Sequence, residues 1–278
     1  MKDRKAKNSP PWEGPGEASI QARTYRTRFS SQRFRSFVVN YKDSDLWIGV
    51  DPESFHPEME TVAFETVKTL RHQLEHYFLV DPEYGRTLIP LDTKPDAPEI
   101  VNILAEAGKK AGVGPMAAVA GAFSEEIGKI LLRDFGIKEL VIENGGDIFL
   151  KLEKPLLLSI FAGNSVLSEK IGIEIPAQET PLGVCTSSGT VGPSLSFGIA
   201  DAVMVACKST AIADAFATAL ANQVKTPGDV QTVAETSEQF PEILSVVAIC
   251  QDKLGIRSNF EMKLVAPSRP YPKGKEIG

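Results

Sequence analysis

The 278-residue chain has few of the residues that mark zinc sites, disulfide scaffolds or membrane spans. Its three cysteines are widely spaced and form no CxxC pair, so neither a zinc site nor a disulfide framework is predicted. This cysteine usage is typical of a reducing compartment, and we expect a cytoplasmic location. Every apolar run is shorter than the roughly 18–20 residues that cross a bilayer, so no membrane partner is expected.

The sequence also lacks an excess of basic residues. Its formal net charge is −6 at pH 7, whereas nucleic-acid phosphates favour a basic face, so no nucleic-acid partner is expected. The N-terminus is charged and rich in proline and glycine, without the apolar core of a secretory signal. We predict a disordered tail over residues 1–19, a single domain over 20–270 that is open to division into two similar halves, and a loose tail over 271–278.

Histidine is equally scarce, but two of the three histidines fall at i and i+4 of a predicted helix over residues 57–79. His72 and His76 therefore have the spacing of a metal-binding pair. No glutamate stands between them in the HExxH manner, and the charged neighbours favour a solvated face. The alternative of two surface histidines is the stronger interpretation.

Apolar periodicity predicts many short strands and three or four long helices. The strands are joined mostly by hairpins, and the helices do not alternate with them as in a doubly wound sheet. The fold class predicted is therefore α+β. Helices are expected over 57–79, 99–110, about 115–134 and 209–222, with a loop over 81–98. A less regular segment is expected from 226, before closing strands over 244–249 and 262–265.

Two glycine-containing stretches are candidate ligand sites. The turn formed by Asn144, Gly145, Gly146 and Asp147 is a strong hairpin signal, and its glycines could also let a ligand approach the backbone. The stretch from Gly114 to Gly121 enters a helix, where free N–H groups attract anions. Its small residues are explained equally well by tight helix packing.

A third candidate is a loop rich in hydroxyls and glycine. Its side chains and N–H groups suit phosphate or carboxylate, although an ordinary polar connection is the alternative. The loop consists of Thr186, Ser187, Ser188, Gly189 and Thr190. Cys185 directly precedes it and is a candidate for sulfur chemistry, against the commoner role of a buried structural cysteine.

The alanine-rich helix over 209–222 carries the metal candidate. Asp214 and Thr218 are at i and i+4, so a carboxylate and a hydroxyl share one face and could hold a hard cation. Ser209 is the predicted N-cap of this helix.

An internal repeat connects two of these stretches. Residues 118–127 (AVAGAFSEEI) align with residues 211–220 (AIADAFATAL), 93 positions later, with four identities among ten positions. This alignment indicates an internal duplication, and a chance match of two alanine-rich stretches is the alternative. We expect the two helices to lie side by side, to bring Glu125 towards Thr218, and to gather all four candidate stretches at one pocket.

In this order, the blocks GxGPMAAVAGA, ENGGDI, TSSGTVG and STAIADAFATALAN resemble the ApbE-like superfamily over about residues 112–222. Its founding members are flavin transferases that use FAD and Mg²⁺ to attach FMN to a threonine of a target protein. The chain looks most like a smaller branch found in anaerobic bacteria and archaea. The resemblance implies an ApbE-like, T-fold-like architecture of mixed and antiparallel sheets with long helices.

The resemblance also implies roles for individual residues. Asp214 and Thr218 match the metal-binding Asp and Thr of the transferases, residues 144–147 match their glycine pair, and residues 187–189 match their serine–glycine loop near the flavin. Ala120 stands where the transferases carry a lysine, and no histidine follows His76, whereas the transferases have a later His-Ile-Ile-Asp-Pro segment. Without these groups for charge neutralisation and proton handling, FMN transfer is not expected.

Three functions remain open at this stage. The resemblance implies a component of anaerobic homocysteine and sulfur metabolism, with protein partners in that route. The alternatives are an FMN transferase or FAD hydrolase that depends on FAD and Mg²⁺, and a non-catalytic module that binds a flavin, another nucleotide or a small anion. A homodimer is also expected.

Overall fold

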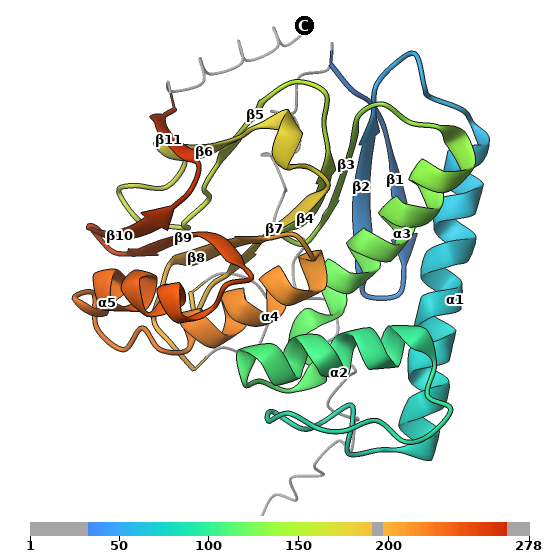
Figure 1. Cartoon of the computed structure of the whole chain (residues 1–278), viewed down its shortest axis with the longest axis horizontal. Helices are drawn as coiled ribbons and strands as arrows, with labels where there is room; N and C mark the ends of the chain where they lie inside the picture. The colour runs from blue at the N-terminus through green and yellow to red at the C-terminus, as the bar shows by residue number, and fades with distance from the viewer. Residues whose placement is uncertain (1–32, 191–196, 266–278) are drawn as a thin grey trace, which may run out of the picture.

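The computed structural model describes residues 33–190 and 197–265. At its centre lies an eight-stranded sheet in which every neighbouring pair is antiparallel, in the order β1-β2-β3-β4-β7-β8-β9-β10 (Figure 1). The α+β class predicted from the sequence is confirmed. The expected tails, residues 1–19 and 271–278, lie outside the described residues. The strands are β1 (Arg35–Tyr41), β2 (Ser44–Val50), β3 (Leu140–Asn144), β4 (Asp147–Lys151), β7 (Leu182–Ser187), β8 (Ala202–Cys207), β9 (Ile243–Cys250) and β10 (Lys253–Ser258).

The two halves of this sheet repeat one order of elements. In the first half, the β1–β2 hairpin is followed by helices and then by the β3–β4 hairpin; in the second, β7–β8, helices and β9–β10 follow in the same order, and β4 pairs with β7 to join the halves. This repetition agrees with the duplication that the sequence indicates. The helices are α1 (Glu58–Val80), α2 (Glu99–Ala111), the short 3₁₀ turn η2 (Pro115–Ala118) and α3 (Val119–Phe135) in the first half, and α4 (Thr210–Ala221), α5 (Asp229–Thr236) and the 3₁₀ turn η4 (Ser237–Gln239) in the second.

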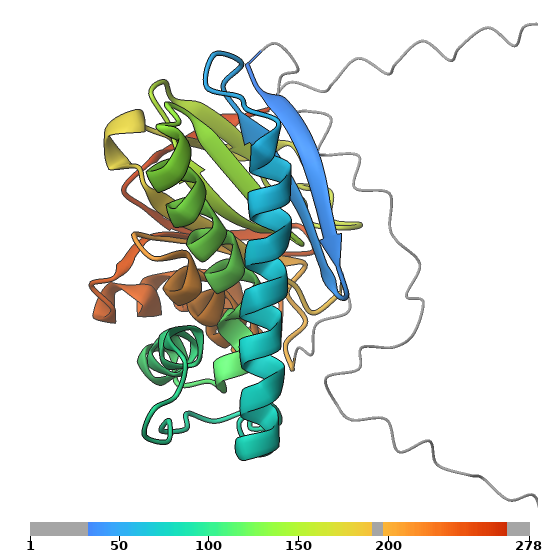
Figure 2. The ribbon, with the colours of Figure 1, turned by 90° about the vertical axis from the view of Figure 1, so that its right-hand side faces the viewer.

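Both faces of the large sheet are covered. The helices pack on one face, where α1 lies between β1 and α3 (Figure 2). The other face packs against a small sheet of β5 (Leu156–Ser159), β6 (Ile171–Ile175) and β11 (Glu261–Leu264). In the chain, β5, β6 and the 3₁₀ turn η3 (Ala177–Glu179) follow β4, whereas β11 follows β10. Because alternate residues of a strand point to opposite faces, β8 must be apolar throughout: Val203 and Val205 face the helices, whereas Met204 faces the small sheet.

The chain after residue 226 is more regular than the sequence predicts, since it forms α5 and β10. The α5 sequence, DVQTVAET, is short and has little helix propensity, and its start is fixed by the Asp229 carboxylate, which accepts the N–H groups of Lys225 and Thr226. In β10, Gly255 allows the backbone of Val230 to approach closely. Among the described residues, no helix combines the length and apolarity needed to cross a membrane.

Candidate functional site

The β3–β4 hairpin places the first group of candidate residues. Asn144 pairs with Asp147, and the two glycines between them have φ values of 71° and 110°. Only glycine adopts such values readily, so the turn itself accounts for Gly145 and Gly146. The Glu143 carboxylate accepts the N–H of Gly146 at 2.8 Å and closes the turn. The predicted hairpin is confirmed.

Helices α3 and α4 cross at the two residues that the internal repeat aligns. The N–H of Gly121 donates to Oδ2 of Asp214 at 2.9 Å. A Cβ on Gly121 would lie 2.5 Å from the carbonyl oxygen of Thr210, so the close approach of the helices requires glycine. Tight helix packing therefore explains Gly121.

The hairpin turn reaches the same crossing. The amide of Asn144 donates to the carbonyl of Ala120 at 3.3 Å. The carboxylate of Asp147 accepts hydrogen bonds from the Cys185 thiol and the Thr186 N–H, and it interacts electrostatically with Asp214. Asp147 and Asp214, which we call the acid pair, are 9% and 8% exposed. The fold thus brings together three of the four candidate stretches and the first residue of the loop.

Burial perturbs both members of the acid pair. Burial raises the pKa of Asp147 well above its usual range, and repulsion from Asp214 raises it further; the hydrogen bonds from Cys185 and Thr186 oppose this only in part. Burial also raises the pKa of Asp214 to about 7, against the opposing effect of the N–H groups of Gly121 and Ala120. The pair therefore retains a proton near neutral pH, and a cation between the two side chains would offset the repulsion between the two carboxylates.

Cys185 lies within this cluster but is not poised for sulfur chemistry. Its side chain is fully buried, and its thiol lies 3.4 Å from the carbonyl of Thr210. Burial raises the pKa of the thiol, and the nearby charges of Asp147 and Asp214 raise it further. Because the thiolate is the reactive form of cysteine, this environment favours a structural role.

The hydroxyl-rich loop turns away from the acid pair towards the start of β8. Ser188 Oγ lies 3.3 Å from Thr190 Oγ1, and Thr190 donates to Asp201 at 3.0 Å. The N–H of Gly189 donates to the carbonyl of Ala200 at 2.9 Å. Asp201 also lines a hollow of about 390 Å³ with Asn164, Ser165, Val166, Gln251 and Asp252. The last two residues of the TSSGTVG block lie outside the described residues.

Of two further candidates, Gly114 stands apart from the acid pair and Thr218 lies on the helix that carries Asp214. Gly114 packs against the loop after α1: its N–H donates to the carbonyl of Leu88 at 2.9 Å, and a Cβ there would lie 2.0 Å from the carbonyl oxygen of Thr87. Thr218 is half-buried one turn beyond Asp214, and its carbonyl accepts the N–H of Asn222. Gly114 therefore belongs to loop packing, whereas Thr218 shares α4 with Asp214.

The expected contact between Glu125 and Thr218 is wrong. Gly121 contacts Asp214, whereas Glu125, one turn later in α3, contacts Thr210, one turn earlier in α4. The two helices therefore run in opposite directions, and Thr218 lies on the other side of the crossing from Glu125. The N-cap position predicted for Ser209 is confirmed, but the Ser209 side chain does not do the capping. Ser209 occupies the N-cap position without a capping bond from its own side chain, and its hydroxyl instead donates to Glu125 at 2.9 Å.

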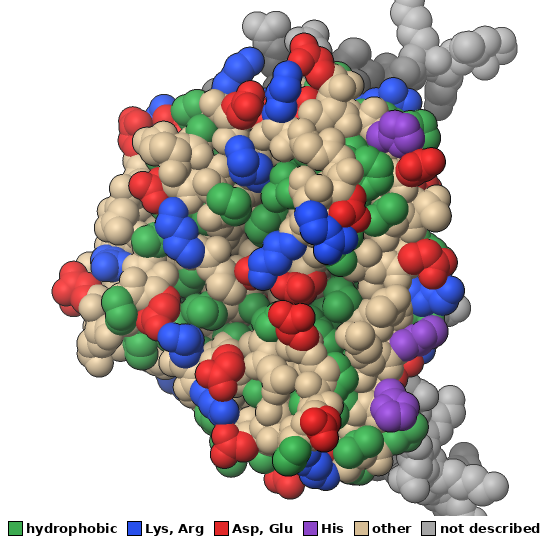
Figure 3. Space-filling model, turned by 45° about the vertical axis from the view of Figure 1, so that its right-hand side comes forward, with side chains coloured by type: hydrophobic (Ala, Val, Ile, Leu, Met, Phe, Trp, Pro, Cys, Tyr) green, Lys and Arg blue, Asp and Glu red, His purple; other side chains and the backbone are tan. Residues whose placement is uncertain are grey.

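The histidines do not gather at a site. In Figure 3 they appear as separate purple groups along one edge of the face, and His72 Nε2 lies 2.8 Å from the hydroxyl of Tyr41. Within residues 33–190 and 197–265, no three His, Cys, Asp or Glu side chains are placed to hold a metal ion. A cation at the acid pair would therefore complete its shell with other oxygens, such as those of water or a substrate phosphate, as Mg²⁺ commonly does.

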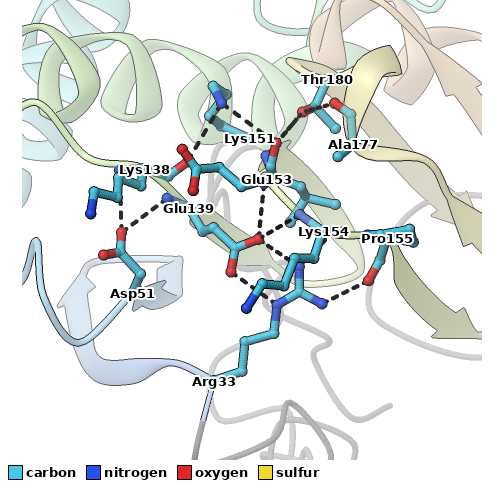
Figure 4. Close-up of polar contacts among 11 residues, drawn as sticks. Arg33, Asp51, Lys138, Glu139, Lys151, Glu153, Lys154, Pro155, Ala177 and Thr180 are labelled. Atoms are coloured by element: carbon cyan, nitrogen blue, oxygen red, sulfur yellow. Dashed lines mark hydrogen bonds and ion pairs between the residues drawn. The ribbon is translucent and has the colours of Figure 1, made fainter.

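A second group of carboxylates lies at the opposite end of the β3–β4 hairpin (Figure 4). Arg33 donates to both oxygens of Glu139, at 2.6 and 3.0 Å. Glu139 also accepts the N–H groups of Glu153 and Lys154, at 2.9 and 3.0 Å, while Asp51 accepts the N–H of Glu139 at 2.9 Å. We call this group the Glu139 cluster. Sequence reasoning missed it because its members come from four distant segments.

Comparisons with known proteins agree with this fold. A family model described as "AbpE bacteria" matches residues 26–242. The chain is 37% identical to a UPF0280 protein of Methanocaldococcus jannaschii over 78% of this chain and 87% of that protein, and 42% identical to a UPF0280 protein of Methanococcus aeolicus over the same shares.

Among solved structures, the chain is similar to the apo form of the flavinyl transferase ApbE of Pseudomonas stutzeri, with a TM-score of 0.51 at 14% identity over 81% of this chain and 94% of that chain. It is also similar to an ApbE protein of Thermotoga maritima, with a TM-score of 0.52 at 11% identity over 81% and 97% of the two chains. At these identities the likeness shows the fold alone.

Proposed function

The chain belongs to the AbpE bacteria family, and we propose that it binds a nucleotide with a diphosphate group, FAD being the first candidate, together with Mg²⁺ at the acid pair. The observation that carries this proposal is the pair itself. Two buried carboxylates, Asp147 at the start of β4 and Asp214 on α4, interact beside the α3–α4 crossing, and the groups that act on Asp147 are carboxylates, a thiol and a backbone N–H. The two acidic side chains have the chemistry to hold a hard cation.

The residues present fit Mg²⁺ better than they fit a bare phosphate. Mg²⁺ is usually held by one or two carboxylates and completes its shell with water and substrate phosphates. Asp214 and Asp147 would supply the carboxylates, and the hydroxyl of Thr218 a third oxygen from the same helix. The N–H groups of Gly121 and Ala120 already donate to Asp214, so they would hold that carboxylate rather than the phosphate. Bound Mg²⁺ would neutralise the diphosphate charge.

We favour binding over FMN transfer. Ala120 lies beside the acid pair, where the transferases have a lysine, so the chain's own side chains at this point add no positive charge to a diphosphate. A role in homocysteine or sulfur metabolism through Cys185 has less support, because the thiol is buried and its pKa is raised. FAD hydrolysis remains a testable extension of binding, since Mg²⁺ also polarises a diphosphate.

The proposal is tested by titrating the purified chain with FAD in Mg²⁺ and in EDTA, with flavin fluorescence and calorimetry as readouts. We expect binding in Mg²⁺ that is lost in EDTA and in Asp214→Asn. The matched control is Asp134→Asn, which removes an exposed carboxylate at the far end of α3 and should leave binding unchanged. AMP release, followed by chromatography, would identify hydrolysis.

Two outcomes would overturn the proposal. The first is an absence of FAD or adenine-nucleotide binding to the folded chain in Mg²⁺. The second is binding that is equally tight in EDTA and in Asp214→Asn, which would place the ligand away from the acid pair.

A further inference from the structure

The N-terminus of α4 is held by a carboxylate from another helix. Oε2 of Glu125 accepts the N–H of Thr210 at 2.6 Å, the N–H of Ala211 at 3.3 Å and the hydroxyl of Ser209 at 2.9 Å. The first N–H groups of a helix have no partner within it, and a carboxylate is favoured there. Glu125 is 8% exposed, so the cap is largely removed from water.

The arrangement is reciprocal. Asp214 of α4 accepts the N–H groups of Ala120 and Gly121, which belong to the first turn of α3. Each helix therefore lends a carboxylate to the N-terminus of the other. On α3 the two participating residues, Gly121 and Glu125, are one turn apart, and on α4 so are Thr210 and Asp214. These four residues, linked by the hydrogen bonds between the helices, form a closed loop.

We infer that Glu125 is a positioning residue for Asp214. Without it, the first N–H groups of α4 would be buried without partners, and the helix would have to shift or fray to find them. The two helices approach so closely at Gly121 and Asp214 that their relative position has little freedom: a Cβ on Gly121 would already lie 2.8 Å from the Cβ of Asp214. A small shift of α4 therefore breaks the hydrogen bond between Gly121 and Asp214 and moves the carboxylate. The consequence for Mg²⁺ rests on the proposed function; the consequence for the hydrogen bond does not.

The chain offers a matched control for this inference. Lys129 forms ion pairs with Glu125 at 2.9 Å and with its neighbour Glu126 at 2.8 Å. Glu126 thus shares the helix and the cationic partner of Glu125, but it makes no contact with α4 among those described. Substitution of Glu126 removes a carboxylate and a lysine contact without touching the loop of contacts.

The experiment compares Glu125→Ala, Glu125→Gln and Glu126→Ala in the full chain. The first readout is residue-resolved amide exchange without metal. The second is the Kd of Mn²⁺, used as a paramagnetic probe in the presence of FAD. For Glu125→Ala we expect faster exchange of the Gly121 amide, unchanged exchange of the Leu131 amide further along α3, and an increase in the Mn²⁺ Kd of about 10–100-fold, as for residues that orient metal ligands. Glu125→Gln keeps an oxygen acceptor and should restore both properties in part, while Glu126→Ala should match the wild type.

The outcomes separate the two proposals. If the wild type binds no Mn²⁺, the proposed function fails, and amide exchange alone decides the role of Glu125. If a folded Glu125→Ala chain keeps wild-type exchange at Gly121, the positioning role is wrong. If that variant does not fold, Glu125→Gln decides: wild-type exchange at Gly121 and wild-type Mn²⁺ affinity would overturn the inference, and an intermediate loss would support it.

Discussion

The two ends of the β3–β4 hairpin carry buried carboxylates in opposite electrostatic states. At one end, burial raises the pKa of Glu139, but the hydrogen bonds from Arg33 and from the N–H groups of Glu153 and Lys154 outweigh it and hold the pKa below its usual value. At the other end, burial and mutual repulsion raise the pKa values of the acid pair. The negative charge of Glu139 is compensated by Arg33 and backbone N–H groups of the chain itself, whereas the negative charge of the acid pair would be compensated by a proton or by a cation from solution. The first is a structural device and the second a candidate site.

The largest effect that sharpens this contrast is expected from pH. The pKa of Asp214 is raised to about 7 in the folded chain, above the value of about 3.9 that is usual in an unfolded chain. The folded state therefore binds this proton more tightly, and the stability it contributes is complete below about pH 4 and is lost as pH rises through 7. Over that range the loss amounts to about 4 kcal/mol. Urea unfolding in EDTA at pH 5 and pH 8 measures the part of this loss that falls above pH 5, about 3 kcal/mol, and a stability that is equal or higher at pH 8 would contradict it.

The next largest effect on stability is expected from removing the cation that pairs with Glu139. Arg33→Ala leaves Glu139 without its cation and should lower the free energy of unfolding by roughly 3 kcal/mol, as for other partly buried pairs that lose one partner. Lys68→Ala is the control, since it removes an exposed ion pair with Glu65 on α1 and should cost less than about 1 kcal/mol. Equal effects of the two variants in denaturant unfolding at pH 7 would show that the Glu139 cluster contributes no more than a surface pair.

The reverse change removes the repulsion from the acid pair. Asp147→Asn should raise the free energy of unfolding in EDTA at pH 8 by about 1–2 kcal/mol, because an uncompensated buried charge is removed. At pH 5, where the pair is protonated, the gain should largely disappear. The same variant should also lose any rise in Tm that Mg²⁺ gives to the wild type. A variant that is destabilised to the same extent at both pH values would indicate that Asp147 acts through its hydrogen bonds alone.

The smallest effect is expected at Cys185. Cys185→Ala removes the weak hydrogen bonding of a buried thiol that lies beside Asp147 and 3.4 Å from the carbonyl of Thr210, and it should change the free energy of unfolding by about 1 kcal/mol. Mg²⁺-dependent binding of FAD should be the same as in the wild type when measured by fluorescence titration. Loss of binding in a folded Cys185→Ala chain would make the thiol part of the site.

The sequence predicts those features that depend on local pattern. Helical spacing gives α1 and α2, the turn chemistry of Asn144–Asp147 gives the β3–β4 hairpin, and the aligned stretches give the side-by-side packing of α3 and α4. The contact between Gly121 and Asp214 is implicit in that alignment, because these two residues occupy the same position of the repeat. Features of this kind can be predicted because the residues of one short segment, such as the turn from Asn144 to Asp147, decide the local backbone conformation.

The remainder depends on contacts between distant segments. A serine before a helix predicts a cap, and Ser209 follows that rule in position; the carboxylate that performs the task comes from Glu125, whose approach is visible only once the helices are packed. Gly114 has the same appearance in sequence as Gly121, yet it accommodates a loop rather than a helix. The three-dimensional charge balance that separates Asp147 from Glu139 likewise has no local signal.

The meeting of Gly121 and Asp214 has a consequence for how such a chain could arise. Two identical halves related by a two-fold axis would place the same residue on both sides of the crossing: two glycines would leave the position without an acid, and two aspartates would collide in a space that has no room for a second Cβ. A homodimer of half-length chains therefore cannot build this crossing. Joining both halves in one polypeptide frees each copy to change alone, so that one gives up its side chain while the other keeps a carboxylate. The difference between Gly121 and Asp214 at the crossing is therefore possible only because both halves belong to one chain.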